Sequence, residues 1–216
     1  MRRRTMAVAV AVVVLGCGGK DDAPSNSVEA MARAVANAPK VEAAMETAEQ
    51  FQQERVARGD TLAMPYAELQ EYLPSSVDGY SAEGGPSGSQ QSMPGFSMSQ
   101  TQQTWVGEAD GDGNTPEVEV TLVDFGGTQQ AYAMMAAPLL MGFSQEDDHQ
   151  RVGSIPIDVA HSAGWQEYDK DSKDAKVTAI TRYRYVITVE ARNQGEDRTA
   201  MVKRLAESIA RRFEGK

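Results

Sequence analysis

The sequence has few of the residues on which metal sites and disulfide bonds depend. It contains one cysteine, Cys17, and two histidines, His149 and His161, among its 216 residues. A single cysteine excludes a disulfide within the chain. The two histidines are not at helical spacing from each other, so they do not indicate a zinc site. We therefore expect no bound metal and no cofactor.

Sequence motifs of enzymes are also missing. There is no Gly-x-Ser-x-Gly nucleophile elbow, and no glycine-rich phosphate loop with its lysine. Ser154, Asp158 and His161 are close in the sequence, but a catalytic triad is defined by spatial arrangement. The sequence therefore favours a protein that is not an enzyme. The alternative is a periplasmic enzyme or metal-handling protein. Exposure of His161 beside carboxylates in a deep pocket would favour that alternative.

The chain has neither an excess of positive charge nor an apolar run of membrane-spanning length near its start. The run from Met6 to Leu15 is shorter than the roughly 20 residues of a transmembrane helix. Acidic residues outnumber basic ones by 31 to 21, which gives a net charge of −10. Such a surface repels phosphate backbones, so we expect no nucleic acid as a partner.

The first 17 residues have the organisation of a secretory signal. Arg2, Arg3 and Arg4 precede the apolar run, and the small residue Gly16 stands just before Cys17. A charged start, a short apolar segment and a small residue at the cleavage position are typical of a signal peptide. We therefore predict that residues 1–16 form one.

The string Val14-Leu15-Gly16-Cys17 resembles the lipobox of bacterial lipoproteins. The resemblance implies cleavage before Cys17, which then carries two or three acyl chains such as palmitate. Two or more acyl chains anchor a protein stably to a membrane. In such lipoproteins an aspartate after the cysteine resembles an inner-membrane retention signal, and Gly18 stands there instead. This favours the outer membrane, facing the periplasm. The alternative is an ordinary signal with Cys17 as an incidental thiol.

A tether and a helical stalk are expected after the anchor. Residues 17–27 are small, polar and mixed, as in a flexible linker. Residues 28–60 are rich in Ala, Glu, Met and Gln, which are strong helix formers, and Pro39 predicts either two helices or one kinked helix. The apolar stripes are too weak for a sustained coiled coil. We interpret this segment as a stalk, with a helix-mediated envelope assembly factor as the alternative.

Residues 64–216 predict one α+β domain, with a mainly antiparallel sheet and helices packed on one face. Alternation of apolar and polar residues favours strands over Glu117–Phe125 and Lys176–Arg192, and the second needs a tight turn near Arg182-Tyr183. Gly84–Pro94 is rich in Gly, Ser and Gln and is interpreted as a mobile loop. Further strands are expected over Val77–Glu83, Phe96–Glu108, Ile155–Val159 and Gly164–Tyr168, and helices over Pro65–Leu73, over Gln129–Gly142 and from Gly195 or Asp197 onward.

Three further patterns have structural explanations. Asp110–Asn114 carries Asp, Asp and Asn at alternate positions like a calcium loop, but Thr115 and Thr121 stand where an EF-hand needs Gly and Glu, so a hairpin turn is favoured. Met93 and Met98 flank the Gly/Ser segment, and two methionines alone do not indicate a copper site. Four aromatic residues are expected in the core against the helices rather than on a binding surface: Trp165, Tyr168, Tyr183 and Tyr185.

Several strings of the domain resemble an uncharacterised family of bacterial lipoproteins. They are Tyr72–Tyr80, Val118–Asp124, Trp165–Asp169 and Tyr185–Glu190. The order of elements is also similar to the small α+β sandwich of PsbP-like proteins, and these resemblances imply binding or assembly rather than catalysis. We therefore expect a lipid-anchored envelope protein with a non-catalytic binding or scaffolding domain. Its expected partners are the membrane, through acyl chains on Cys17, and an unknown envelope protein or small ligand.

Overall fold

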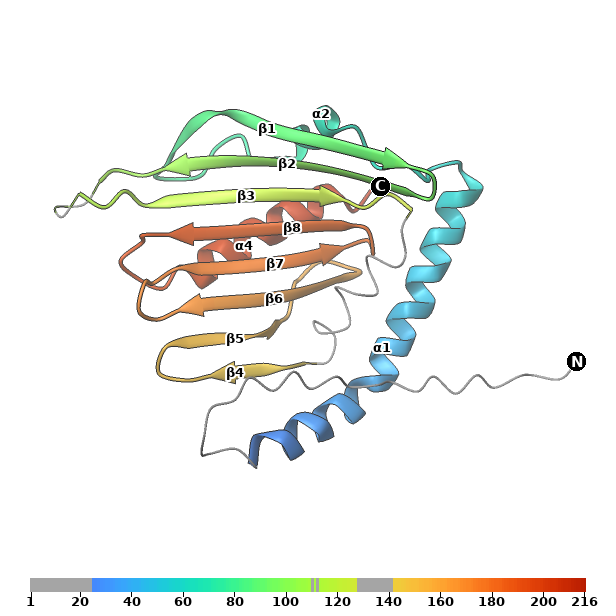
Figure 1. Ribbon diagram of the computed structural model, residues 1–216, viewed down its shortest axis with the longest axis horizontal. Coiled ribbons are helices and arrows are strands. Elements are labelled where there is room, and N and C mark those ends of the chain that lie inside the picture. Colours follow the sequence, from blue (N-terminus) through green and yellow to red (C-terminus); the bar gives the residue numbers. More distant parts are fainter. Residues whose placement is uncertain (1–24, 110, 112, 128–141) are drawn as a thin grey trace, which may run out of the picture.

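The computed structural model of the protein describes residues 25–109, 111, 113–127 and 142–216. Its centre is an eight-stranded antiparallel sheet that carries helices on both faces (Figure 1). The predicted signal peptide, Cys17 and nearly all of the helix expected over 129–142 lie outside the described residues.

The sheet has the strand order β1-β2-β3-β8-β7-β6-β5-β4, and every neighbouring pair is antiparallel, as predicted. The strands are β1 (Ser81–Met93), β2 (Phe96–Val106), β3 (Glu117–Asp124), β4 (Ser144–Glu146), β5 (Gln150–Ile155), β6 (Ser162–Asp169), β7 (Ala175–Thr181) and β8 (Tyr185–Arg192). One meander starts at each edge of the sheet. The two meet where β3 pairs with β8 along its whole length.

The helices lie in three places around this sheet. Helix α1 (Ser25–Ala57) runs past the ends of the strands, α2 (Tyr66–Leu69) continues into the 3₁₀ helix η1 (Gln70–Tyr72), and α4 (Thr199–Arg212) packs along β7 and β8 (Figure 1). Helix α1 contains Pro39 and bends within its first half (Figure 1). The kinked helix is thus the correct one of the two predicted forms, because proline lacks the N–H group and crowds the preceding turn.

The main core lies between α4 and one face of the sheet. Alternate residues of β3, β7 and β8 point into it, among them Val120, Val177 and Ile187, which are completely buried. Helix α4 covers them with Val202, Ala206 and Ile209, and Phe213, directly after the helix, continues the same spacing. Burying one such large aliphatic side chain contributes about 1.5–3 kcal/mol. The predicted apolar face of the last helix is confirmed.

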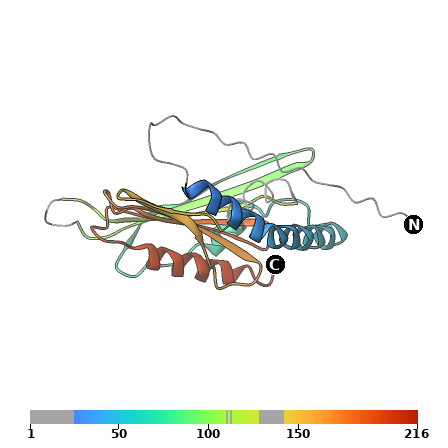
Figure 2. The ribbon, with the colours of Figure 1, turned by 90° about the horizontal axis from the view of Figure 1, so that it is seen from below.

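The second half of α1, which was predicted as a stalk separate from the domain, packs on the face of the sheet opposite α4. Because strand side chains alternate, Ala179 and Ile187 face α4 while their neighbours Ile180 and Val186 face away from it. Ala48 of α1 is buried against Ile180 and Val186. Figure 2 shows α4 beneath the sheet, whereas α1 does not lie beneath it. The helix predicted as a stalk therefore contacts the domain.

The segment Gly84–Pro94, predicted as a mobile loop, is instead most of strand β1. It pairs with β2 up to Met93 opposite Phe96, and Pro94-Gly95 forms the connecting turn. Gly95 has a φ of +80°, and proline followed by a residue with positive φ is typical of a type II turn. The loop prediction was wrong because strand pairing satisfies backbone hydrogen bonds even where the side chains are small and polar.

Other strands differ from the prediction in position. Val77 makes only an isolated bridge with Tyr80, just before β1 begins. Strand β5 ends at Ile155, where the predicted strand was expected to begin. The three residues of β4 were not predicted, because all are polar and exposed and leave no apolar pattern to detect.

The turn predicted near Arg182-Tyr183 is confirmed and joins β7 to β8. Arg182 and Tyr183 have φ values of +55° and +57°, and the Arg184 N–H donates to the Thr181 carbonyl at 3.2 Å, which is type I′ geometry. Side chains other than glycine rarely adopt this conformation. Here the Arg182 guanidinium lies 4.5 Å above the Phe51 ring of α1, and the Tyr183 ring centre lies 5.2 Å from it. These contacts with α1 support the turn.

A buried ion pair joins the end of β3 to the start of β8. Asp124 is 0% and Arg184 4% exposed, and the guanidinium donates to Oδ1 at 2.6 Å and to Oδ2 at 2.9 Å. The backbone N–H groups of Gly126 and Met64 donate to the same two oxygens, each at 2.7 Å. Each carboxylate oxygen therefore accepts two hydrogen bonds, which compensates for its removal from water.

The same arginine holds the segment that connects α1 to α2. Nη1 of Arg184 donates to both oxygens of Asp60 at 2.9 Å, and Nη2 donates to the Leu62 carbonyl at 2.9 Å. Burial opposes the charge of Arg184, but the hydrogen bonds and charge of Asp124 outweigh burial and raise the pKa of Arg184 above its usual value. The guanidinium therefore stays charged and connects three parts of the chain, namely the end of β3, the start of β8 and the segment between α1 and α2.

Removing one member of this pair is expected to cost more than removing both. Asp124→Ala leaves the Arg184 charge buried without its partner, and we expect the free energy of unfolding to fall by about 3–5 kcal/mol. The double variant Asp124→Leu, Arg184→Met replaces the pair by apolar side chains of similar size and should be clearly more stable than Asp124→Ala. Urea denaturation measures both.

Asp158 supplies the control, because its side chain is 94% exposed and lies 3.8 Å from Arg211. Asp158→Ala should leave the urea midpoint close to that of the parent chain. If the double variant were as unstable as Asp124→Ala, the loss would not come from an unpaired buried charge.

Candidate functional site

Strand β1 forms one edge of the sheet (Figure 1). All 13 of its residues are exposed, and no other strand of the described residues pairs with its outer side. An edge strand presents a row of unpaired N–H and C=O groups, which is a template for an added strand. The opposite edge, β4, has only three residues. The length and exposure of β1 make it the candidate binding site of this sheet.

Only the first half of β1 has the features that usually protect an edge. The register with β2 shifts between Glu83 and Ser87, and this stretch contains Pro86 and a positive φ at Gly84. Bulges, prolines and charges of this kind discourage further pairing. From Ser87 to Met93 the register is regular, with neither charge nor proline. We call these seven residues, 87–93, the open edge.

The open edge lies within a segment that has no charge. Residues 84–107 contain no Asp, Glu, Lys, Arg or His, although 24% of the whole chain is charged. The acidic surface elsewhere repels acidic molecules over roughly a Debye length, about 8–10 Å at physiological salt. A strand that approaches the open edge meets no fixed charge on residues 84–107. Binding there needs no ion to be desolvated.

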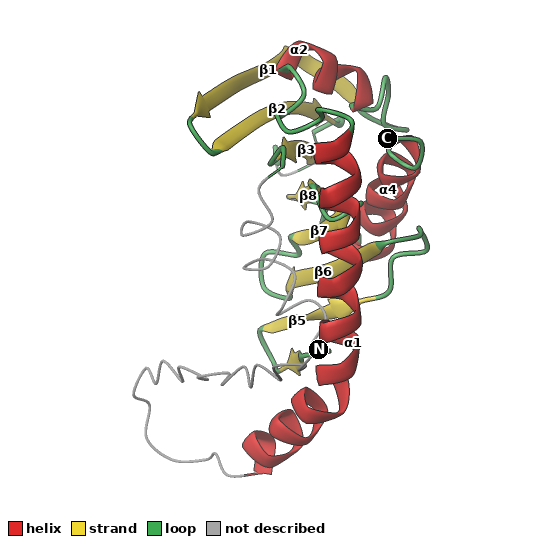
Figure 3. Cartoon of the chain, turned by 90° about the vertical axis from the view of Figure 1, so that its right-hand side faces the viewer, coloured by secondary structure: helices red, strands yellow, loops and turns green. Residues whose placement is uncertain are grey.

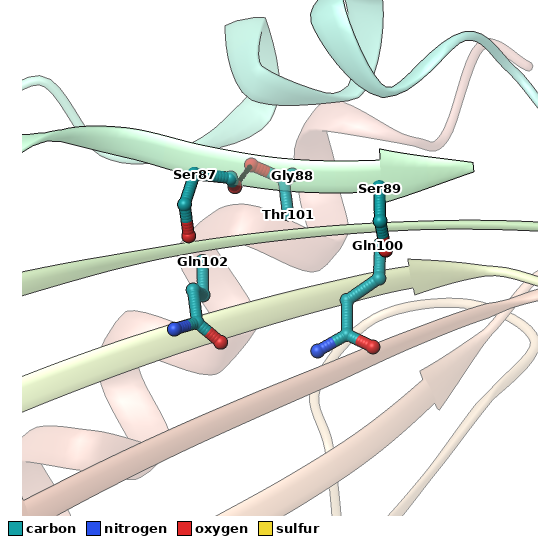
Figure 4. Close-up of a pocket in the computed structure, with 6 residues that line it drawn as sticks. All are labelled: Ser87, Gly88, Ser89, Gln100, Thr101 and Gln102. Atoms are coloured by element: carbon teal, nitrogen blue, oxygen red, sulfur yellow. Dashed lines mark hydrogen bonds between the residues drawn. The ribbon is translucent and has the colours of Figure 1, made fainter.

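A shallow polar pocket of about 220 Å³ lies on one face of the β1–β2 hairpin (Figure 4). It is lined by Ser87, Gly88, Ser89, Gln100, Thr101 and Gln102. The register places Ser87 opposite Gln102 and Ser89 opposite Gln100, and Figure 4 shows both glutamine side chains extending to the same side of the sheet. Hydroxyl and amide groups donate and accept hydrogen bonds. The pocket therefore suits a polar, uncharged ligand group.

Helix α2 supports the hairpin on its other face, at Gly88. A Cβ atom on Gly88 would lie 2.6 Å from Cδ2 of Tyr66, so only glycine lets the tyrosine ring rest on the strand. Opposite Gly88, the Thr101 hydroxyl donates to the Ser87 carbonyl at 2.7 Å. The pocket face and the face covered by Tyr66 are therefore different sides of the same strand.

Charged side chains of the sheet pair with one another away from the open edge. On β8, Arg192 donates to both carboxylate oxygens of Glu190 at 2.9 and 3.0 Å, and Arg192 also lies 3.9 Å from Glu119. These hydrogen bonds, together with the charge of Arg192, lower the pKa of Glu190 below its usual value despite partial burial. A carboxylate held in this state is a poor proton acceptor near neutral pH.

The structure separates the two histidines. His149 precedes β5, where its Nδ1 lies 2.9 Å from the Asp171 carboxylate in exposed turns. His161 precedes β6, where it packs on Phe51 and Tyr183 at ring distances of 5.0 and 5.8 Å. Aromatic rings, rather than the carboxylates that would favour an enzyme, surround His161 in the described structure.

The three residues considered as a triad do not converge. Asp158 faces α4, where its carboxylate lies 3.8 Å from Arg211, whereas His161 faces α1. Ser154 lies on β5 opposite Trp165. Across the described residues, no group of three or more His, Cys, Asp or Glu side chains is placed to hold a metal ion.

The four aromatic residues predicted for the core lie on both faces of the sheet. Tyr168 and Tyr185 are buried on the face covered by α4, as expected. Trp165 and Tyr183 are half-buried on the other face, where Trp165 stacks on Phe143 with ring centres 5.9 Å apart. Their alternation along the strands could have predicted this division.

The remaining candidates are only partly described. Met93 ends β1 and is 58% exposed, and Met98 lies opposite Gln91 within the hairpin. Asp110 and Asp112 of the predicted hairpin turn lie outside the described residues, as Cys17 does. In the part of the chain that is described, no helix has both the length and the apolar character needed to cross a membrane.

Comparisons with known proteins add little to this geometry. No family model matches the chain, and no curated protein is similar to it. Among solved structures, it is similar to the extracellular domain of PknH from Mycobacterium tuberculosis, with a TM-score of 0.44 and 12% sequence identity over 72% of this chain and 100% of that domain. Because the TM-score is below 0.5, this similarity supports no conclusion about function or location.

The contact between Gly88 and Tyr66 generates a stability prediction. Gly88→Val should lower the free energy of unfolding by about 1–3 kcal/mol, because the tyrosine ring must move. In a Tyr66→Ala background the same change should cost much less, since the obstacle is gone. Ser89→Val, on the opposite face, is the matched control. Urea denaturation of all variants tests this, and an equal cost with and without Tyr66 would disprove the contact.

Proposed function

We propose that this chain is a lipid-anchored protein of the cell envelope whose domain binds an extended polypeptide by strand addition at the open edge. The observation that carries the proposal is the open edge itself, seven regular, uncharged and exposed residues at the end of a large sheet. Binding by strand addition takes its affinity from backbone hydrogen bonds and its specificity from the side chains beside them.

The dimensions of the site suit a short peptide segment. Seven residues of antiparallel strand span about 24 Å. Each backbone hydrogen bond contributes only about 0.5–1.5 kcal/mol net, and the incoming segment loses conformational freedom. Strand pairing alone therefore gives modest affinity. The polar pocket at Ser89 and Gln100 supplies specificity by accepting an uncharged polar side chain of the partner.

The location follows from the leader sequence. Arg2 to Arg4, the apolar run and Cys17 support export and lipid attachment, and Gly18 favours the outer membrane facing the periplasm. Two or three acyl chains would hold the chain on the membrane without a membrane-spanning helix. The partner is accordingly an envelope protein, and the role of the domain is binding or scaffolding rather than catalysis.

Assembly through α1 is the weaker proposal. Part of the apolar surface of its second half is occupied, since Ala48 is buried against β7 and β8 and Met45 packs on the same cluster. A helix that uses its apolar side chains on its own domain has few left for a partner helix.

Lipid attachment is tested at Cys17. The parent chain should fractionate with membranes and have a mass increased by its acyl chains, whereas Cys17→Ser should stay uncleaved or be released in soluble form. Intact-mass spectrometry of the membrane and soluble fractions decides between these states. An unmodified Cys17 on a chain that retains its leader would disprove the anchor.

Strand addition is tested by placing a photo-crosslinking residue at Gln90, in the middle of the open edge, and at Gln145 on β4 as the control. Irradiation of intact cells should join Gln90 to one segment of one partner, identified by mass spectrometry, with far less product at Gln145. A synthetic peptide of that segment should then slow amide hydrogen exchange in residues 87–93 of the purified protein. Equal products at both positions, or peptide binding without this protection, would argue against strand addition.

A further inference from the structure

Helix α1 sets the orientation of the open edge relative to the predicted anchor. It begins beyond β4, passes the ends of the strands and finishes beside β1, β2 and β3, as the views in Figures 1 and 3 agree. Its 33 residues correspond to a length of about 50 Å. The start of α1, nearest to Cys17 in the sequence, is therefore at the opposite side of the domain from the open edge.

Contacts along α1 hold it in this position. Gln52 Nε2 donates to the Gly127 carbonyl at 2.9 Å, and Arg55 Nη1 donates to the Arg182 carbonyl at 3.4 Å. In the first half, a Cβ atom on Gly142 would lie 2.9 Å from Nδ2 of Asn37, so the helix also passes close to the segment that leads into β4. The second half of α1 is thus hydrogen-bonded to the domain beside β3 and β7, and its first half passes close to the segment before β4.

We infer that the open edge faces away from the membrane that holds Cys17, and that its partner is an extended polypeptide segment outside that membrane. The inference rests on the proposed lipid anchor and strand addition. The eight residues from Cys17 to Pro24 reach at most about 28 Å, so the start of α1 stays within that distance of the lipid and the open edge lies farther out.

Charge favours the same orientation. Without the three arginines of the leader, the net charge changes from −10 to −13. Anionic headgroups repel such a domain and oppose its lying flat on the surface.

A second copy in the same membrane does not fit this geometry. Two copies paired through their open edges would be related by a two-fold axis. Their α1 helices would then start on opposite sides of the pair, separated by about twice the helix length, or 100 Å. Tethers of about 28 Å could not bring both anchors to one flat membrane with the domains upright. The geometry favours a partner of a different kind.

The experiment uses the full lipidated chain in vesicles that contain anionic phosphatidylglycerol and a lipid with a nitroxide on its headgroup. Because acylation occupies the Cys17 thiol, a cysteine introduced by Gln90→Cys or Gln145→Cys is the one thiol that a fluorophore can label. The label at position 145, on β4, should be quenched several-fold more strongly than the label at position 90. Val56→Cys, near the end of α1 and 55% exposed, should resemble position 90.

A second variant tests α1 as the cause. Ile180→Asp places a charge in the small apolar cluster under α1. Urea denaturation followed by circular dichroism checks that the sheet of this variant is folded. Release of α1 should then raise quenching at position 90 towards that at position 145. Quenching that is equal at both positions in the parent chain, or stronger at position 90, would overturn the inference.

The outcomes separate this inference from the proposed function. A chain that does not bind the vesicles would disprove the anchor and the orientation, whereas strand addition would still be decided by crosslinking at Gln90. A chain that binds, with equal quenching at both positions, would disprove the orientation alone. Crosslinking at Gln90 between two differently tagged copies in one membrane would overturn the choice of partner while leaving strand addition supported.

Discussion

The ion pair of Arg184 and Asp124 is the contact on which the arrangement of the other elements depends. A buried charge without its partner costs several kcal/mol, so both residues must become ordered together. They lie where the two meanders meet, and the contacts of Arg184 with Asp60 and of Asp124 with the Met64 N–H add the segment that follows α1. The same contact that unites the halves of the sheet therefore places the end of α1 and the start of α2.

Helix α1 is held more weakly than the sheet that it crosses. The buried part of the apolar cluster beneath it consists of Ala48, Ile180 and Val186. Arg55, in the last turn of α1, is buried beside Arg184. Burial and the positive charge of Arg184 lower the pKa of Arg55. The carbonyl groups at the end of a helix act in the opposite direction, because they favour a cation. Few buried apolar contacts are a feature of elements that open locally. Changes of orientation relative to the membrane would begin here.

The sequence predicted those elements in which one face is apolar. The alternation in β3, the long β7–β8 hairpin and the apolar face of α4 were recognised because burial leaves a regular pattern in the sequence. Strands β1 and β4 leave no such pattern, since their residues are all exposed and pair only through the backbone. The dipeptide Pro94-Gly95, a common turn signal, would have indicated the β1–β2 hairpin. The side chains of the open edge are not needed for the core. They therefore leave no apolar pattern in the sequence, and for the same reason they are free to contact a partner.

A polar edge resolves the conflict between accessibility and aggregation. A flat, apolar edge of this length would pair indiscriminately, and an edge guarded by lysine would not pair at all. Ser, Gly and Gln between residues 87 and 93 have low hydrophobicity and modest strand propensity, so pairing there is weak unless a partner adds side-chain contacts. Two copies of this acidic chain also repel each other as whole molecules. Weak strand pairing and charge repulsion together disfavour self-association. They favour a partner whose strand also fits the pocket beside Ser89 and Gln100.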